Sequence, residues 1–289
     1  MARPHRVPSR MPVHAWGLHS GYKRRHPAQY LEKKVKNIFV ILSGGPGLYD
    51  PQDKFSHDAS WANFVTPPLL RSRGAVLHDE KTEEVHWLVF EPAYEARWAH
   101  DSANRKTAPT QYDHTVGIKR EGFGSYLGKI KKRAVERGWK YKGISSHQGF
   151  WDHFKGLKGR KVSRVWFYGH AQHDLWLSVT HNENHQAASP DSSAIVKTAD
   201  IKNLDAFIFP TRITESFPHK FFGCNSQQFA SEWAKTLKVY SEGSTGTVDF
   251  FKIDHTGGKV TLSSGAKWYQ YSKAGFPRLL LSKAGDVVE

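Results

Sequence analysis

The sequence predicts an α/β fold, with a mostly parallel sheet flanked by helices and a C-terminal β excursion. Continuous apolar runs that end at turn residues are typical of strands buried on both faces of a parallel sheet. Four segments show this pattern: "KNIFVILSGGPGLYD", "VHWLVFEPAY" from Val85, "VSRVWFYG" and the shorter "HKFFG". Helical segments alternate with them, as expected for a parallel sheet.

The helices are predicted from apolar residues at helical spacing. "SYLGKIKKRAVERGW" has an apolar face opposite a basic one, and "SQQFASEWAKTLKVY" places Phe229, Trp233 and Leu237 four residues apart. Between the last two apolar runs we expect a strand at "LWLSV" and a helix at "TADIKNLDAF". The end of the chain reads as short strands, "VDFFKI", "GKVTL" and "KWYQY", separated by glycine turns.

Length and composition predict one globular domain with appendages. The chain has 289 residues, 38% of them hydrophobic, and ten tryptophans, which is enough apolar bulk for a core. We expect a basic flexible tail over 1–36, an α/β domain over 37–250 and a β-rich extension over 251–289 that packs on the same domain.

The formal charge of +15 is unevenly distributed. Residues 1–36 hold nine Lys or Arg against one Glu, and residues 119–142 hold nine against two. Such blocks can bind nucleic acid or another anionic partner. The favoured interpretation is a solvated tail and a solvated helix face, because no nucleic-acid motif accompanies the charge.

No apolar stretch approaches the roughly 18 residues of a membrane span, and the N-terminus lacks the pattern of a signal peptide. We therefore expect no membrane partner, and a protein that is cytoplasmic or secreted by a route that needs no signal peptide. The single cysteine excludes an internal disulfide. The oligomeric state cannot be predicted.

His170 and Cys224 each follow an apolar run and a glycine. The carboxyl ends of parallel strands meet at one edge of a sheet, where ligands bind, so we expect the imidazole and the sulfur to face each other there. Asn225 or Ser226 could cap the following helix. We expect the start of that helix to lower the pKa of the thiol. The competing interpretation is a buried cysteine that packs as a small hydrophobic residue.

The order of these segments resembles the caspase-like cysteine peptidases, the group that holds caspases, gingipains, separase and the CHAT domains. The resemblance spans about 37–250 and is specific over 162–246, where "VWFYGHA" and "KFFGCNS" lie. It implies a caspase-like fold, His170 as the catalytic histidine and Cys224 as the nucleophile. It also implies an oxyanion hole formed by the backbone amides of Cys224 and Ala171.

Two positions depart from the family pattern. Ala171 stands where glycine usually follows the histidine, which the oxyanion hole tolerates if φ there is negative. Phe222 stands where arginine- and lysine-specific members often carry an acidic residue, so substrate preference does not transfer.

Carboxylates near the predicted edge are candidates for substrate binding. The loop "SGGPGLYDPQDKFSHDASWANF" follows the first strand, and in the family this loop helps form the specificity pocket. Turn formation is the alternative role for such residues. The candidates are Asp50, Asp53, His57, Asp58 and, from the later loop, Asp174.

Other constellations are weaker. Histidines at 170, 173, 181 and 185 lie near Asp174, but the asparagine-rich "HNENH" does not favour the helical turn that zinc would need. "SGGPG" is similar to the oxyanion loop of some α/β-hydrolases, yet no G-x-S-x-G occurs. "EPAYEARW" is interpreted as a helix start with surface ion pairs. We expect no metal and no cofactor.

The predicted function is a cysteine peptidase that cleaves a peptide or isopeptide bond in a protein or peptide substrate, through a Cys224/His170 dyad and a thioester. A bacterial toxin or effector is one setting compatible with this sequence. The alternative is a basic binding module on the same fold, without turnover. Replacing Cys224 separates the two.

Overall fold

The computed structural model describes residues 35–50, 58–71, 80–104, 124–180, 190–210, 215, 217–250 and 258–288. All of them belong to one compact unit, Val35–Glu289. The predicted basic tail, 1–36, lies outside the described residues except for its last two.

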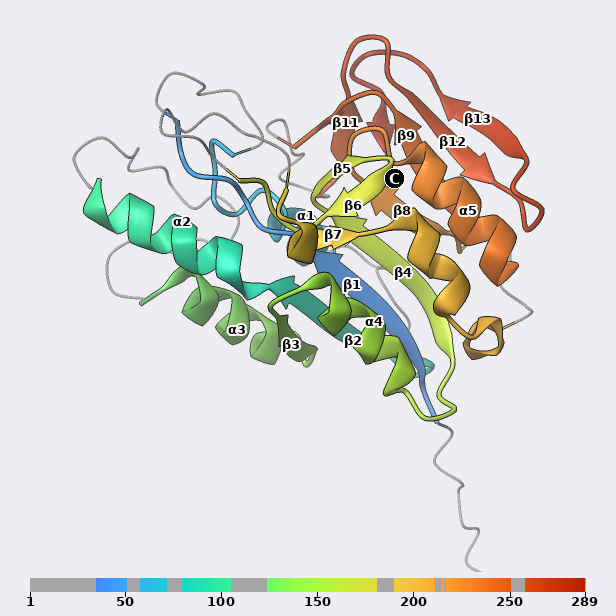
Figure 1. The fold of residues 1–289 in the computed structure, drawn as a ribbon, viewed down its shortest axis with the longest axis horizontal. Coiled ribbons are helices and arrows are strands. Elements are labelled where there is room, and N and C mark those ends of the chain that lie inside the picture. The colour runs from blue at the N-terminus through green and yellow to red at the C-terminus, as the bar shows by residue number, and fades with distance from the viewer. Residues whose placement is uncertain are drawn as a thin grey trace, which may run out of the picture. The chain divides into compact units, whose positions relative to one another are not determined.

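An eight-stranded sheet forms the centre of this unit (Figure 1). Six neighbouring strands, from β9 to β3, pair in parallel. Beyond β9, β12 pairs antiparallel with β9, and the edge strand β13 pairs antiparallel with β12. In order across the sheet, the strands are β13 (Pro277–Leu281), β12 (Lys267–Tyr271), β9 (Ser241–Thr245), β8 (His219–Phe222), β4 (Val162–Tyr168), β1 (Asn37–Ser43), β2 (Glu83–Phe90) and β3 (Lys140–Ile144). The predicted α/β fold with a mostly parallel sheet is confirmed.

The sheet is buried on both faces, as its apolar strands predict. In β1, Ile38, Val40 and Leu42 belong to one core cluster, whereas Phe39 and Ile41 belong to the other. Side chains alternate between the two faces of a strand, so a continuous apolar run fills two cores at once.

Helices cover both faces. α4 and α5 pack their aromatic residues into the core cluster of Ile38, and α3 packs into the other cluster. Figure 1 shows α2 and α3 beside β2 and β3, and α5 beside β12. The helices are α1 (Thr66–Arg71), α2 (Glu91–Ala103), α3 (Tyr126–Glu136), α4 (His147–Lys155) and α5 (Gln227–Leu237).

Two small three-stranded sheets flank the centre. The first contains β5 (His170–Gln172), β6 (Asp174–Trp176) and β7 (Ile195–Val196), and Figure 1 shows β5 and β6 just beyond the carboxyl end of β4. The second contains β10 (Val248–Asp249), β11 (Val260–Leu262) and β14 (Val287–Val288).

Two sequence-based expectations need correction. The segment "TADIKNLDAF" forms two 3-10 turns, η2 (Thr198–Asn203) and η3 (Ala206–Ile208), instead of an α-helix. The predicted strand at "LWLSV" begins earlier and ends at Trp176. Both segments lie in irregular connections where tertiary contacts outweigh local propensity.

None of the helices in the described ranges combines the length and apolar composition that a membrane span requires.

Candidate active site

His170 and Cys224 follow two neighbouring parallel strands at matching positions. β4 and β8 pair with Tyr168 opposite Phe222, and each strand then continues through a glycine. The amide of Gly169 donates to the carbonyl of Phe222 over 3.3 Å. The two segments therefore leave the same edge of the sheet side by side.

Glycine is required at this crossing because the segments almost touch. A Cβ on Gly223 would lie 2.6 Å from the Cβ of Ala171 and 3.1 Å from the carbonyl oxygen of Gly169. Both distances are shorter than ordinary van der Waals contact. A side chain here would push apart the segments that carry the histidine and the cysteine.

The turn that carries Cys224 is fixed by its neighbours. Asn225 adopts a left-handed conformation with a φ of 52°. Its backbone amide donates to the carbonyl of Gly246 over 2.9 Å, and its side-chain oxygen accepts from the amide of Gly246 at 2.8 Å. The carbonyl of Asn225 accepts from the amide of His173 at 3.2 Å, which ties this turn to the histidine loop.

The predicted cap of α5 does not form. The hydroxyl of Ser226 donates to the carbonyl of Phe221 at 2.7 Å and accepts from the amide of Ser244 at 3.1 Å. Ser226 is the N-cap residue by position, without a side-chain cap bond. Its side chain holds the turn against the sheet.

The expected low pKa of Cys224 is wrong for this arrangement. Burial raises the pKa of the thiol, and the nearby carboxylate of Asp249 acts in the same direction. The Sγ atom lies 3.9 Å from the carbonyl oxygen of Val248, within reach of a weak hydrogen bond. Desolvation of the thiolate is the largest of these influences and favours the neutral thiol.

His170 is held by Asp58 and Phe64, both from the loop after β1. Its Nε2 lies 3.1 Å from the Oδ1 of Asp58, and its ring meets the ring of Phe64 edge-on with centroids 4.9 Å apart. Phe64 also packs against Phe250 at 4.9 Å. Phe64 and Phe250 belong to the same core cluster as Val248, whose carbonyl oxygen lies 3.9 Å from the Sγ of Cys224.

Asp58 is a buried, ionised carboxylate. Burial alone would raise the pKa of this carboxyl. The His170 ring and the amide of Gly47 lower the pKa by more than burial raises it, so it falls to about 2. The Oδ1 atom accepts from the amide of Gly47 at 2.6 Å. Asp58 was predicted to bind substrate, whereas its carboxylate is occupied by the catalytic histidine of the predicted dyad.

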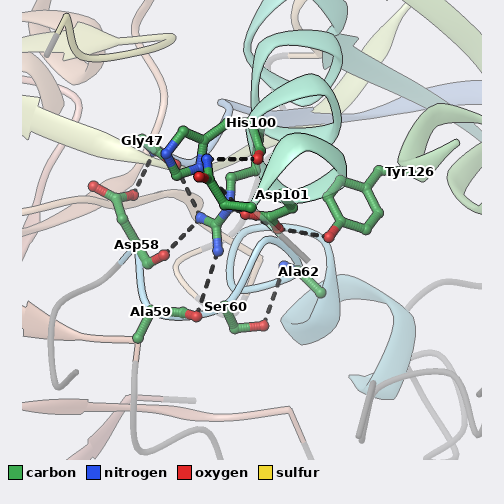
Figure 2. Close-up of polar contacts among 10 residues, drawn as sticks. Gly47, Asp58, Ala59, Ser60, Ala62, His100, Asp101 and Tyr126 are labelled. Carbon is green, nitrogen blue, oxygen red and sulfur yellow. Dashed lines mark hydrogen bonds and ion pairs between the residues drawn. The ribbon is translucent and has the colours of Figure 1, made fainter. Parts of the chain in front are cut away.

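Arg97 holds the Asp58 loop in place from α2. Its Nη1 donates to the carbonyl oxygens of Gly47 at 2.9 Å and Asp58 at 2.6 Å. Its Nε lies 3.0 Å from both carboxylate oxygens of Asp101, which also accepts from the hydroxyl of Tyr126 at 2.6 Å. Figure 2 shows the Asp58 loop on one side of this network and Asp101 with Tyr126 on the other.

The surface ion pairs predicted at the start of this helix are found for Glu91, which pairs with Lys131. The prediction is wrong for Arg97, whose side chain is 3% exposed and pairs with the buried Asp101. The spacing of Arg97 and Asp101 by four residues signals an ion pair on a helix. Nothing in the sequence signals the two loop carbonyls that the arginine also binds.

Of the remaining predicted substrate-binding residues, the structure describes Asp50 and Asp174. Asp53 and His57 lie outside the described residues, and Asp50 is half-buried. The carboxylate of Asp174 accepts from the amide of Thr198 at 2.6 Å. Asp174 also lines a cavity of about 790 Å³ beside α5, together with Lys202, Gln228 and Glu232 among others.

Ala171 does not have a positive φ. The condition for an alanine in the predicted oxyanion hole is therefore met, and the role of its amide and that of Cys224 stays a prediction. Among the residues that the structure describes, no group of three or more His, Cys, Asp or Glu side chains could hold a metal ion. The "HNENH" segment lies outside them.

No protein-family model matches the chain, and neither a curated protein nor a solved structure is significantly similar to it.

Proposed function

We propose that the protein is a cysteine hydrolase that cleaves peptide or isopeptide bonds, with Cys224 as nucleophile and His170 as general base and acid. The observation that carries this proposal is the pairing of Tyr168 with Phe222, which sends Gly-His and Gly-Cys off the same sheet edge. Cys224 directly precedes Asn225, which has a left-handed conformation and is bonded to Gly246. Such a fixed turn is consistent with a nucleophile that is held in position.

The reaction begins from a neutral thiol, because burial raises the pKa of Cys224. The thiol proton passes to His170 as the sulfur attacks the carbonyl carbon, and the amides of Ala171 and Cys224 accommodate the oxyanion. The C–N bond breaks, the amine takes the proton from His170, and the acyl group stays on sulfur as a thioester. Water then attacks the thioester, giving one proton to His170, and the released sulfur recovers it.

Casein cleavage and alkylation by iodoacetamide test the proposal. Cys224→Ala should abolish both cleavage and labelling. His170→Ala should slow alkylation at pH 7 by roughly 100-fold, the lower range of what a general base supplies. His147→Ala is the matched control, since His147 is a half-buried histidine on another element, α4, whose Nδ1 lies 3.1 Å from the carbonyl oxygen of Ser193.

Cleavage that survives Cys224→Ala would refute the proposal. Alkylation that is equally fast with and without His170 would show that the histidine does not activate the thiol.

The second candidate is a basic binding module without turnover. The raised pKa of Cys224 and the net charge of +15 favour it. In that case Cys224→Ala changes nothing, and filter binding to DNA at two salt concentrations should show affinity that falls steeply with salt. Deleting residues 1–36 tests whether the tail carries that affinity.

A further inference from the structure

Asp58 is a buried carboxylate in a loop, outside every helix and strand. It is 6% exposed, belongs to the loop between β1 and α1, and is 112 residues from His170 in sequence. Burying an ionised carboxylate is costly unless it is paired and hydrogen-bonded. The hydrogen bonds to His170 and Gly47 supply that compensation, and so tie the loop to the imidazole.

The ionisation of Asp58 determines which nitrogen of His170 carries the proton. An ionised carboxylate can only accept hydrogen bonds. The Nε2 atom, 3.1 Å from Oδ1, is therefore the donor. In the neutral ring Nδ1 then carries the lone pair, so the proposed mechanism requires Nδ1 to take the proton of the thiol.

The position of the ring is fixed from several sides. Phe64 packs edge-on against it, and the Asp58 backbone is held by Arg97, whose side chain is 3% exposed. Arg97 also binds the carbonyl of Gly47, the residue whose amide donates to the Asp58 carboxylate. One buried arginine thus holds the backbone of Asp58 and the backbone of Gly47, the residue whose amide binds the Asp58 carboxylate.

A negative charge beside the ring also favours the imidazolium that forms during the reaction. When His170 takes the thiol proton, the ring becomes a cation, and the Asp58 carboxylate stabilises it. This contribution matters for a thiol that burial keeps neutral, because the cysteine gives up its proton only if the acceptor is favourable.

We propose that Asp58 is a positioning residue that holds His170 as the Nε2-protonated tautomer and stabilises its charged form during proton transfer from Cys224. The proposal rests on the proposed function of Cys224 and His170. Asp58 acts through the histidine and touches no reacting atom.

The first test is the rate of Cys224 alkylation by iodoacetamide between pH 5 and 9 in the full-length protein. Asp58→Asn keeps an oxygen for Gly47 and removes the charge, and Asp58→Ala removes both. Each should lower the rate at pH 7 by roughly 10- to 100-fold, less than loss of the base itself. The matched control is Asp205→Asn, which replaces an exposed carboxylate that accepts from the amide of Phe207.

The second test is the tautomer of His170, read by ¹⁵N NMR, which a merely structural role would not move. The wild-type protein should carry the proton on Nε2, and Asp58→Ala should populate both tautomers. The wild-type spectrum needs no variant, so it decides the matter even if Asp58→Ala fails to fold. A wild-type ring protonated on Nδ1 would overturn the proposal.

The two proposals fail in different ways. If His170→Ala slows alkylation and the Asp58 variants do not, Asp58 is no positioning residue and the dyad stands. If His170→Ala itself leaves the rate unchanged, the proposed function fails, and the role of Asp58 fails with it.

Discussion

Two partly buried histidine–carboxylate pairs lie in different parts of the molecule. At the carboxyl edge, the Nε2 of His170 lies 3.1 Å from Asp58. Within β2, the Nε2 of His86 lies 2.6 Å from Glu84. The Nδ1 of His86 lies 3.2 Å from the Nε2 of His153 on α4, so both ring nitrogens of His86 are used inside the fold. His170 instead lies beside the turn that carries Cys224.

The charges around the two pairs differ as well. Burial lowers the pKa of His86, and burial with the neighbouring His86 and Lys142 lowers the pKa of His153 to about 3. Burial raises the pKa of Glu84, but Lys140 and Arg160 bring it down to about 2. We call Glu84, His86 and His153 the inner pair and its neighbour; all three have lowered pKa values, which favours the ionised carboxylate and the neutral imidazoles. A histidine–carboxylate pair is therefore a catalytic candidate only where the rest of the ring can reach a reacting group.

The largest effect is expected from removing Arg97. Arg97→Met removes the guanidinium that pairs with the buried carboxylate of Asp101, and breaking a buried ion pair costs about 3–5 kcal/mol. Urea unfolding should show this loss, and slower alkylation of Cys224 should accompany it. Arg160→Met is the counterpart at the inner pair, where Arg160 is 27% exposed and Lys140 still pairs with Glu84. Arg160→Met should lower the free energy of unfolding by less than about 1 kcal/mol. Equal losses for Arg97→Met and Arg160→Met would contradict the difference between the two pairs.

The inner pair should make the protein sensitive to acid. His86 and His153 have lower pKa values in the folded state than the ordinary value of 6.5, so the unfolded chain binds more protons below that pH. The stability that they contribute is present above pH 6.5 and is lost as the pH falls toward about 3. Each histidine contributes a slope of up to about 1.4 kcal/mol per pH unit.

His153→Gln isolates this contribution. Glutamine can donate to the Nδ1 of His86 and does not titrate, so the fall in unfolding free energy between pH 6.5 and roughly 4.5 should be shallower by about one proton. The carboxylates of Asp58 and Glu84 have a pKa of about 2 and titrate below this window. Alkylation of Cys224 should not change. A slope as steep as that of the wild type would contradict this account of the inner pair.

A smaller effect is expected where the two edge segments cross. Gly223→Ala introduces a Cβ 2.6 Å from that of Ala171, and such overpacking costs roughly 1–3 kcal/mol. Adding Ala171→Gly should recover part of the loss, although the carbonyl of Gly169 stays close. Thermal unfolding of the single and double variants measures the coupling. Additive losses would show that the segments are less tightly packed than the structure indicates.

Sequence patterns predicted the strands whose side chains are apolar. β1, β2, β4 and β8 are continuous hydrophobic runs, and such runs require burial on both faces. β9 was not predicted, because its residues, "SEGST", are polar or glycine, although four of the five are buried. Its Gly243 allows α5 to approach closely, since a Cβ there would lie 2.9 Å from Ala230. Only the neighbouring helix explains that composition.

The sequence by itself determined that His170 and Cys224 follow apolar strands through a glycine, because alternating strand and helix leaves the carboxyl ends of parallel strands at one edge. The tertiary structure alone decided that Asp58 meets His170, that Arg97 holds the loop that carries Asp58, and that the thiol is desolvated. Local patterns fix periodicity and turns. Contacts across 112 residues, and the burial that sets a pKa, depend on how separate loops close over the same edge of the sheet.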